Sequence, residues 1–373
     1  MIILKNCNII DVEKKEITLK DILIEGRKIK KISNEIVENN CEVIDLKGAY
    51  ACAGFIDIST QIGLIESGSK IEGNDIDEIY KEIIPGLKTL NGIYPNDISF
   101  KEAFESGVTT VVVNSGDANA IGAQSSMLKT RGVANIDSIL VNSSIDIKAT
   151  IGDAPKKWNY NSQTTPLSRM GIFNLIRKSL IETKKYINDK KEINLNYEAL
   201  AKILNKEIPL KITVNKAQDI LKALELKEEF DINIILDECA EIHMVKDDIK
   251  KAGVPVILSS ILIERSNPDI INTKTNTAKV LMEEGVLTAV ATHHPKLSSE
   301  LLLLSVITLL REEIDMFDAL KLITVNPAKI MNVYDKIGSI EEGKEADIIF
   351  FDELPIKVKS KIVLALISGE ICS

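Results

Sequence analysis

Between residues 52 and 292, short apolar segments alternate with amphipathic segments of helical period, and this alternation constrains the fold more than any other feature. Several amphipathic segments end in a glycine before the next apolar segment, as at Gly107, Gly253 and Gly285, which is typical of helix C-terminal caps. Helices that alternate with continuously apolar strands indicate a parallel sheet covered by helices. The sequence contains eight such strand segments: AGFIDIS from Ala53, VTTVVVNS from Val108, SILVNS from Ser138, IDIKATIG from Ile145, PLKITVN from Pro209, INIILDE from Ile232, VPVILS from Val254 and LTAVAT from Leu287.

Eight strands over roughly 270 residues match the usual size of a (β/α)8 barrel, so we predict an α/β fold of the TIM-barrel class. Strand-like runs also flank this region. They are MIILKNCNII, DILIEGRKIKKIS and CEVIDLKGAY at the start of the chain, and ADIIFFDEL and SKIVLALISGEIC at its end. We therefore expect a small β-sandwich-like domain built from both termini, residues 1–52 and 335–373, around a barrel of residues 53–334.

Charged residues of both signs are abundant, 46 Lys and Arg against 55 Asp and Glu, which leaves a net charge of -9. A negative protein is repelled on average by polyanions, so we expect neither nucleic acid nor a membrane surface as a partner. The five cysteines are widely spaced without a CxxC pair, which favours free thiols in a reducing compartment. The sequence shows no signal peptide at its start and no apolar stretch long enough to span a bilayer, so we expect a cytoplasmic protein.

Four stretches carry a family likeness. GFIDISTQIG from Gly54 is similar to a first-strand signature GFID-x-H-x-H, and ANAIGAQSSMLKTRG, IKATIGDAP and SRMG are similar to the loops that follow it. PLKITVNKAQDILKALELKEEFDINIILDECAEIH is similar to a fifth strand ending in H-x-H and a sixth ending in E-H. AVATHHP and the later GSIEEGKEADIIFFD are similar to an eighth strand and the strands that return after it. Together these stretches resemble the amidohydrolase superfamily, specifically its imidazolonepropionase-related branch.

The resemblance implies a metal site that this chain does not reproduce. In the superfamily, histidines from strands one, five and six hold one or two divalent ions, and an aspartate after strand eight orients and deprotonates the attacking water. The corresponding positions here are Ser59, Gln61, Thr213, Asn215 and Glu238 for the metal ligands, and His293 for the aspartate. The chain has only three histidines, His243, His293 and His294, and none precedes strand six. We therefore predict that the metal site is lost and that no metal or other cofactor is bound.

A second interpretation keeps an ion at the mouth. Asp57, Gln61, Glu238 and water are oxygen donors of the kind that calcium or magnesium prefers. These ligands would be few, and Asp57 also belongs to the ordinary signature of the family.

Glu238, His293 and His294 are the candidate catalytic residues, because functional groups gather where the strands of such a barrel end. Glu238 and His293 are predicted to pair across the former metal site. The pair is either a polar plug or a rewired acid and base, and we favour the plug. Cys239 is interpreted as a buried structural thiol.

Gln124, Arg169 and Arg265 lie in loops that resemble the family. They either line a retained substrate-shaped pocket or brace the barrel by binding loop carbonyls. Both interpretations stay open.

The functional prediction is a degenerate amidohydrolase-family protein that lacks the metal site and metal-dependent activity, with a ligand-binding or partner role. The alternative is an active hydrolase of a cyclic amide or another non-peptide C–N bond that uses the rewired residues. The expected partners are a small-molecule ligand, a second copy in a homodimer and an intact relative.

Overall fold

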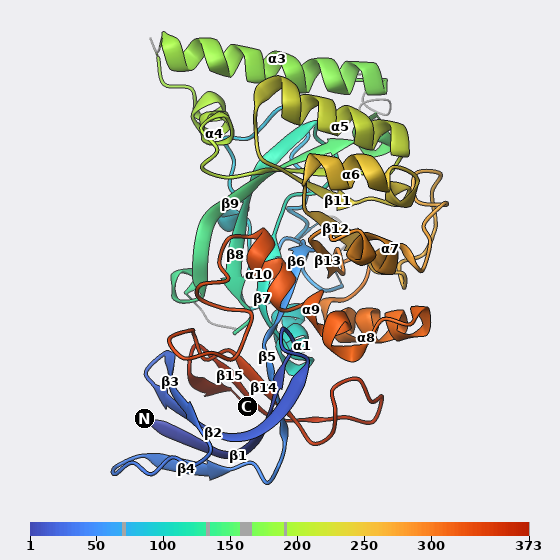
Figure 1. Ribbon diagram of the computed structural model, residues 1–373. Helices are drawn as coiled ribbons and strands as arrows, with labels where there is room; N and C mark the ends of the chain where they lie inside the picture. The colour runs from blue at the N-terminus through green and yellow to red at the C-terminus, as the bar shows by residue number, and fades with distance from the viewer. Residues whose placement is uncertain (69–71, 132–134, 157–165, 190–191, 373) are drawn as a thin grey trace.

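Two eight-stranded sheets organise the chain in the computed structural model, which describes residues 1–68, 72–131, 135–156, 166–189 and 192–372 (Figure 1). One sheet curls into a barrel and is covered by helices, and the other is built from the two ends of the chain. No helix within the described ranges is both long and apolar enough to cross a bilayer.

The barrel sheet runs in chain order from β6 to β13. Its edge strands meet through backbone hydrogen bonds, from His293 N to the Ser59 carbonyl (3.0 Å) and from Gln61 N to the His294 carbonyl (2.8 Å). The sheet is therefore a near-closed barrel. Its strands are β6 (Phe55–Thr60), β7 (Val108–Val113), β8 (Ile121–Lys129), β9 (Leu140–Ile151), β10 (Leu210–Val214), β11 (Ile234–Glu238), β12 (Val256–Ser259) and β13 (Thr288–Ala291).

The TIM-barrel class is confirmed, but the eight strands are not the eight that the sequence predicts. The segments beginning at Ser138 and Ile145 belong to one long strand, β9. The missing strand is β8, which runs antiparallel to both β7 and β9. Its sequence IGAQSSMLK is polar enough to suggest a loop, yet every residue is buried. The fold accommodates these polar side chains because tertiary contacts satisfy them, as Asp146 does for the Ser125 hydroxyl.

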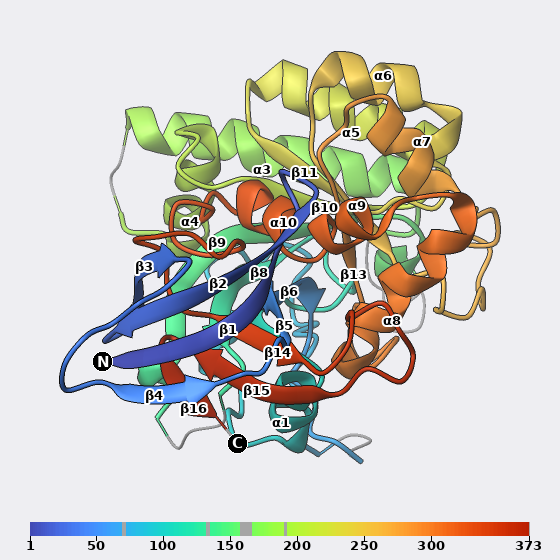
Figure 2. The ribbon, with the colours of Figure 1, turned by 60° about the horizontal axis from the view of Figure 1, so that its bottom comes forward.

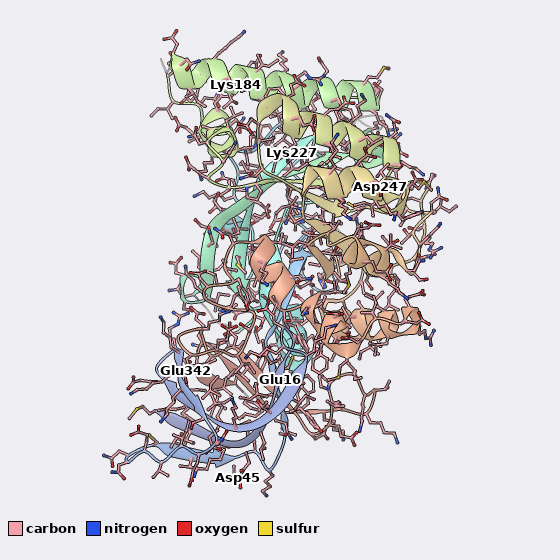
Figure 3. All side chains as sticks on the ribbon, viewed as in Figure 1. Glu16, Asp45, Lys184, Lys227, Asp247 and Glu342 are labelled. Carbon is pink, nitrogen blue, oxygen red and sulfur yellow. The ribbon has the colours of Figure 1, made fainter. Side chains whose placement is uncertain are left out.

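Helices follow most of the parallel strands, and Figure 1 shows α3, α5, α6, α7 and α8 in succession along the outer side of the barrel. Their apolar faces pack on the outward residues of the strands, as Ile220 and Ile249 do in the same cluster as Ile212. Figure 3 labels Lys184, Lys227 and Asp247 on three of these outer helices. The helices are α1 (Ile98–Glu105), α3 (Arg169–Asn188), α4 (Leu195–Leu204), α5 (Ala217–Phe230), α6 (Lys246–Ala252), α7 (Thr277–Glu283), α8 (Leu302–Ile307), α9 (Met316–Lys321) and α10 (Val325–Ile330).

The interior of the barrel has two zones. A buried apolar cluster joins residues of seven strands, among them Ile58, Ile235 and Ile257, and α10 adds Ala328 and Ile330 to it. Polar and charged side chains occupy the C-terminal ends of the strands. This second zone is the mouth of the barrel, where barrel proteins carry their functional groups.

The second sheet confirms that both ends of the chain build one β-structure. Its order is β16-β15-β14-β5-β1-β2-β3, with β4 beside β1, and Figure 2 shows both termini at this sheet. A buried ion pair between Lys129 of β8 and Asp347 ties it to the barrel. The predicted boundaries, residues 1–52 and 335–373 around 53–334, stay a prediction. Its strands are β1 (Ile2–Asp11), β2 (Glu16–Glu25), β3 (Lys28–Ser33), β4 (Glu42–Asp45), β5 (Tyr50–Ala53), β14 (Ile348–Phe351), β15 (Ile362–Ile367) and β16 (Glu370–Cys372).

Gly54 is the residue at which the chain passes from the second sheet into the barrel. A Cβ atom at this position would lie 2.1 Å from the Thr109 hydroxyl oxygen of β7. Only glycine allows the two sheets to approach this closely.

Candidate functional site

The carboxylate of Asp237 gathers side chains from three other strand ends at the mouth of the barrel. His293 Nε2, just after β13, lies 2.8 Å from Asp237 Oδ1. The hydroxyl oxygens of Ser59 and Thr213 lie 3.0 and 3.5 Å from the other carboxylate oxygen, Oδ2. Asp237 is fully buried, so these groups take the place of water around its charge.

The electrostatic surroundings keep Asp237 ionised. Burial alone would raise the pKa of Asp237, but the His293 imidazole and the ammonium groups of Lys148 and Lys211 outweigh it and hold the pKa well below its usual range. Such a carboxylate is a weak base. Because Ser59 faces this carboxylate and not an imidazole, the three side chains do not form the Ser–His–Asp arrangement that activates a serine nucleophile.

Lys211 lies inside the barrel on β10, and its side chain is 0% exposed. Its Nζ is 3.0 Å from Asp146 Oδ2 of β9 and 3.2 Å from Asn114 Oδ1, just after β7. The same Asn114 oxygen lies 3.1 Å from Ser59 Oγ, so this group of contacts continues to Asp237. A lysine and an aspartate buried this deeply are tolerated only because each compensates the charge of the other.

A second group of charges lies beside the first. Lys148 Nζ of β9 is 2.8 Å from Asp117 Oδ1, and Lys296 Nζ is 3.1 Å from Asp117 Oδ2. Lys296 also pairs with Glu238, whose Oε2 accepts a 2.6 Å hydrogen bond from the Asn215 amide. We call the two groups together the mouth network; it comprises Ser59, Asn114, Asp117, Asp146, Lys148, Lys211, Thr213, Asn215, Asp237, Glu238, His293 and Lys296.

The pKa shifts in the second group all favour the charged forms. Burial raises the pKa of Asp117, but Lys148 and Lys296 overcome it, and the pKa ends far below its usual range. Burial lowers the pKa values of both lysines, yet Asp117 raises them again, and both end above their usual range. About 40% of the Lys296 side chain is exposed, but its ammonium is enclosed between the Asp117 and Glu238 carboxylates.

The backbone is strained where the network meets the strand ends. Glu238, Cys239 and His293 have φ angles of 71°, 59° and 52°, in the left-handed region that residues with a Cβ rarely adopt. Hydrogen bonds hold this geometry, from Cys239 N to the Val214 carbonyl and from His293 N to the Ser59 carbonyl, both 3.0 Å. Strain of this kind clusters at functional sites and persists only where surrounding contacts impose it.

The predicted pair of Glu238 and His293 is not formed. His293 contacts Asp237, and Glu238 contacts Lys296 and Asn215. Side chains alternate between the two faces of a strand, so Ile235 and Asp237 share the inward face of β11. Glu238 comes next in the chain and has a left-handed backbone conformation, so its side chain does not point at His293.

The other residues at the mouth have separate surroundings. His294 is 9% exposed, and burial lowers its pKa, so its ring is neutral at pH 7. Gln61 lies beside it through the backbone hydrogen bond described above. Cys239 is buried, and burial with Asp237 and Glu238 nearby raises its pKa well above the usual range, as the structural interpretation expects.

The carboxylate of Asp57 has its hydrogen-bond partners in the segment after β13, and neither Gln61 nor Glu238 is among them. Its carboxylate accepts hydrogen bonds from Thr292 N (3.1 Å) and Ser299 Oγ (2.9 Å). These contacts give Asp57 a bracing role between β6 and the segment after β13.

Two of the three predicted pocket residues are braces. Gln124 is 3% exposed and donates to the Pro85 carbonyl (2.9 Å). Arg169 Nε lies 2.6 Å from Asp219 and its Nη2 lies 2.8 Å from Asp269. Arg265 instead lines a cavity, so the bracing interpretation does not extend to it.

Replacing Arg169 by glutamine is expected to lower the free energy of unfolding by about 1 kcal/mol, a modest loss because the side chain is 33% exposed and solvent screens its charge. The substitution leaves Asp219 and Asp269 facing each other without a cation. Urea unfolding followed by circular dichroism measures the effect. Arg177→Gln, at an exposed pair with Glu229 on the helix surface, is the matched control and should change little. Equal losses in both variants would show that Arg169 is not a special brace.

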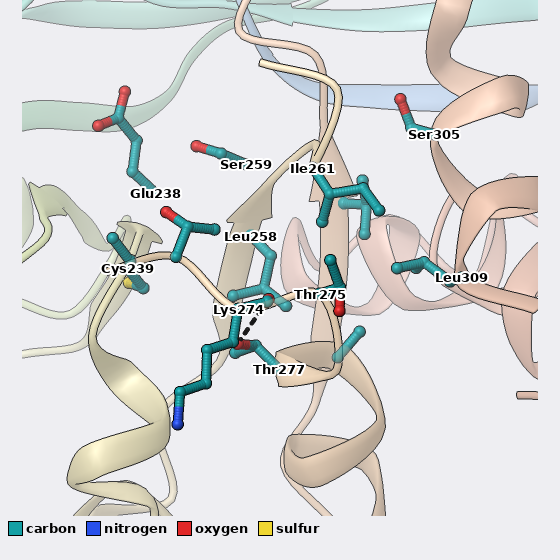
Figure 4. A pocket seen from close by; sticks show the side chains of 14 residues that line it. Glu238, Cys239, Leu258, Ser259, Ile261, Lys274, Thr275, Thr277, Ser305 and Leu309 are labelled. Carbon is teal, nitrogen blue, oxygen red and sulfur yellow. Dashed lines mark hydrogen bonds between the residues drawn. The ribbon is translucent and has the colours of Figure 1, made fainter. Parts of the chain in front are cut away.

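The cavity lined by Arg265 has a volume of about 240 Å³ and lies beside Glu238 and Lys296. A smaller cavity of about 20 Å³ lies next to it, with the apolar side chains of Leu258 and Leu309 in its wall. Figure 4 shows the Glu238 carboxylate and the Ser259 hydroxyl on one side of this smaller cavity, with the Lys274 ammonium pointing the opposite way. The larger cavity lies at the mouth of the barrel, and three residues of the mouth network, Asn215, Glu238 and Lys296, line it.

Most residues of the mouth network were not predicted as site residues from the sequence. Asp237, Lys148 and Lys211 were not among the predicted site residues, although each is a charged residue inside an apolar strand segment. That interruption is a usable signal, because a charge in a buried strand needs a partner. Asp146 carries the same signal in the segment of Lys148, whereas Asp117 and Lys296 carry none.

Comparisons with known proteins agree with this architecture. Residues 189–372 match the sequence profile of the amidohydrolase family. The crystal structure of an amidohydrolase from Thermotoga maritima MSB8 matches the whole chain and 99% of its own, with a TM-score of 0.96 and 29% sequence identity. The chain is thus similar to amidohydrolases in fold along its whole length and in sequence profile over residues 189–372.

One curated relative has a lower sequence identity, and another matches only a short part of the chain. Amidohydrolase tasK of Hapsidospora irregularis is 21% identical over 94% of this chain. A dihydroorotase of Elusimicrobium minutum is 43% identical over 16% of it. The matched regions span only 39% and 14% of the lengths of these two relatives.

The mouth of this barrel does not suit a divalent metal ion. Within the part of the chain that the structure describes, no three His, Cys, Asp or Glu side chains gather closely enough to hold one. The carboxylates of Asp146, Asp237 and Glu238 already have lysine or histidine partners. The donors at residues 59, 213 and 215 are hydroxyl and amide groups, which compete poorly with water for zinc.

Proposed function

We propose that this amidohydrolase-family protein lacks metallohydrolase activity, and that the mouth network stands where the superfamily holds its metal. Lys211 carries the proposal: its ammonium lies 3.0 Å from Asp146, fully buried among the strand ends. An ammonium ion repels a divalent cation and neutralises the carboxylate that would attract one. In this proposal Ser59, Gln61, Thr213, Asn215 and Glu238 are former ligand positions, and the chain descends from the imidazolonepropionase-related branch.

The mouth is proposed to retain a binding role. A cavity of about 240 Å³ opens beside Lys296 and Glu238, and concave sites with a few polar groups are the usual places for small ligands. The network forms a rigid, charge-balanced floor for this cavity. A homodimer and a partnership with an intact relative stay predictions.

The rival function is an active hydrolase of a cyclic amide or another non-peptide C–N bond. It would need Glu238 or His293 as a free acid or base near the substrate. Glu238 is engaged by Lys296 and Asn215, and His293 by Asp237, which weighs against this function.

A turnover assay distinguishes the two functions. Purified protein would be offered hydantoins, lactams and dihydroorotate, before and after incubation with Zn²⁺, Mn²⁺ or Ni²⁺. We expect no hydrolysis above the buffer rate in either condition, because the network leaves no metal-bound water to attack. Metal-dependent turnover would overturn the proposal, whereas metal-independent turnover that Glu238→Gln abolishes would establish the rival.

A further inference from the structure

The cavity beside Lys296 carries two charges that have no partner among the described residues. The side chains of Glu264 and Arg265, at its rim, form no hydrogen bond or ion pair with any described residue. The charges at the floor differ in this respect, since Lys296 and Glu238 neutralise each other. As far as the described residues go, the cavity therefore offers a ligand one unpaired cation, Arg265, and one unpaired anion, Glu264.

The remaining wall is aliphatic. Ile261, Ile263 and Ile270 line the cavity and are half-buried. An apolar group of a ligand gains free energy by covering them, about 25 cal/mol for each Å² removed from water. The cavity thus combines opposite charges at its rim with a branched apolar wall.

We propose that this cavity binds a small α-amino acid, or another zwitterion of that size, with an aliphatic side chain. Its carboxylate would lie at Arg265, its ammonium group at Glu264 and its aliphatic part on the isoleucines. A dicarboxylate would be repelled by Glu264, and a diamine by Arg265, so the two rim charges together select a zwitterion. The proposal rests on the proposed function, because the mutually paired lysines and carboxylates must form the floor.

Isothermal titration calorimetry with L-leucine as the probe tests this inference. Leucinamide, which lacks the carboxylate, and isocaproate, which lacks the ammonium group, are the matched analogues. We expect leucine to bind at least about tenfold more tightly than either analogue, since each analogue leaves one rim charge unpaired. Equal affinity for the three probes, or no heat with leucine, would overturn the inference.

Two variants assign the charges. Arg265→Gln should reduce the affinity for leucine to that for leucinamide, and Glu264→Gln should reduce it to that for isocaproate. Both side chains are exposed, so both variants should fold, and their melting curves check this. Arg177→Gln changes a residue of α3 that does not line the cavity; it is the control and should bind leucine as the original protein does. An Arg265→Gln variant with unchanged selectivity would contradict the assignment.

Elemental analysis of the same samples distinguishes a failure of the proposed function from a failure of the zwitterion inference. Stoichiometric metal would overturn the proposed function whatever leucine does. Metal-free protein without leucine binding would overturn only the zwitterion inference.

Discussion

Lys211→Met is expected to lower the free energy of unfolding by about 3–5 kcal/mol, the usual cost of removing one partner from a buried ion pair. The side chains of Lys211 and Asp146 are both 0% exposed, and their charged atoms lie 3.0 Å apart. Methionine replaces the volume of the lysine but leaves Asp146 charged and uncompensated. Urea unfolding, monitored by circular dichroism, measures the loss.

Two controls give this experiment its meaning. Lys206→Met removes the cation of an exposed ion pair, in which Lys206 Nζ lies 2.8 Å from Asp231 Oδ1. We expect no measurable change in the free energy of unfolding for this variant. The double variant Lys211→Met with Asp146→Asn removes both charges and should recover most of the lost stability. If Lys211→Met is as harmless as Lys206→Met, the buried pair does not contribute as described.

The second large effect is a loss of stability in acid. The folded-state pKa values of Asp117 and Asp237 are lowered, so their contributions are complete above the unfolded value near 3.9 and disappear as the pH falls through the folded values. A salt-bridged aspartate of this kind typically accounts for about 2–3 kcal/mol. The buried Asp57 has a raised pKa, so its contribution runs in the opposite direction and offsets part of this loss.

Denaturant unfolding between pH 7 and acid, compared between the original protein and Asp237→Asn, measures this effect. The variant should lose less stability over the acid range, because asparagine does not titrate. Lys148 and Lys296 have raised pKa values, so their contributions are present below the unfolded value near 10.4 and are lost only above it. Identical acid profiles for the two proteins would show that Asp237 does not carry the expected charge.

The fold could be predicted because strand and helix periods are local properties. The segments from β10 to β13 have apolar runs bounded by helices, and the terminal strands alternate in the same readable way. The strand β8 could not be predicted, because its Gln124 and Ser125 are satisfied by partners far away in the sequence. A hairpin of polar strands inside a barrel becomes visible only with its tertiary contacts.

The sequence could predict which residues lie at the barrel mouth, but not which of their side chains contact each other. Ser59, Thr213, Asn215 and His293 do lie at the mouth, as their places at strand ends indicate. A shift of one residue along β11 decides which carboxylate faces His293. Glu238 was predicted to face it, but Asp237 does. The lysine partners come from β9, β10 and the segment after β13, and no local pattern connects them.

Buried lysines and carboxylates are proposed to stand where the superfamily holds its metal. Elemental analysis of the purified protein by inductively coupled plasma mass spectrometry, after incubation with excess Zn²⁺ and desalting, tests it most directly. We expect zinc, manganese and nickel far below one ion per chain. One ion per chain, lost in Asp237→Asn and retained in the Arg177→Gln control, would contradict it.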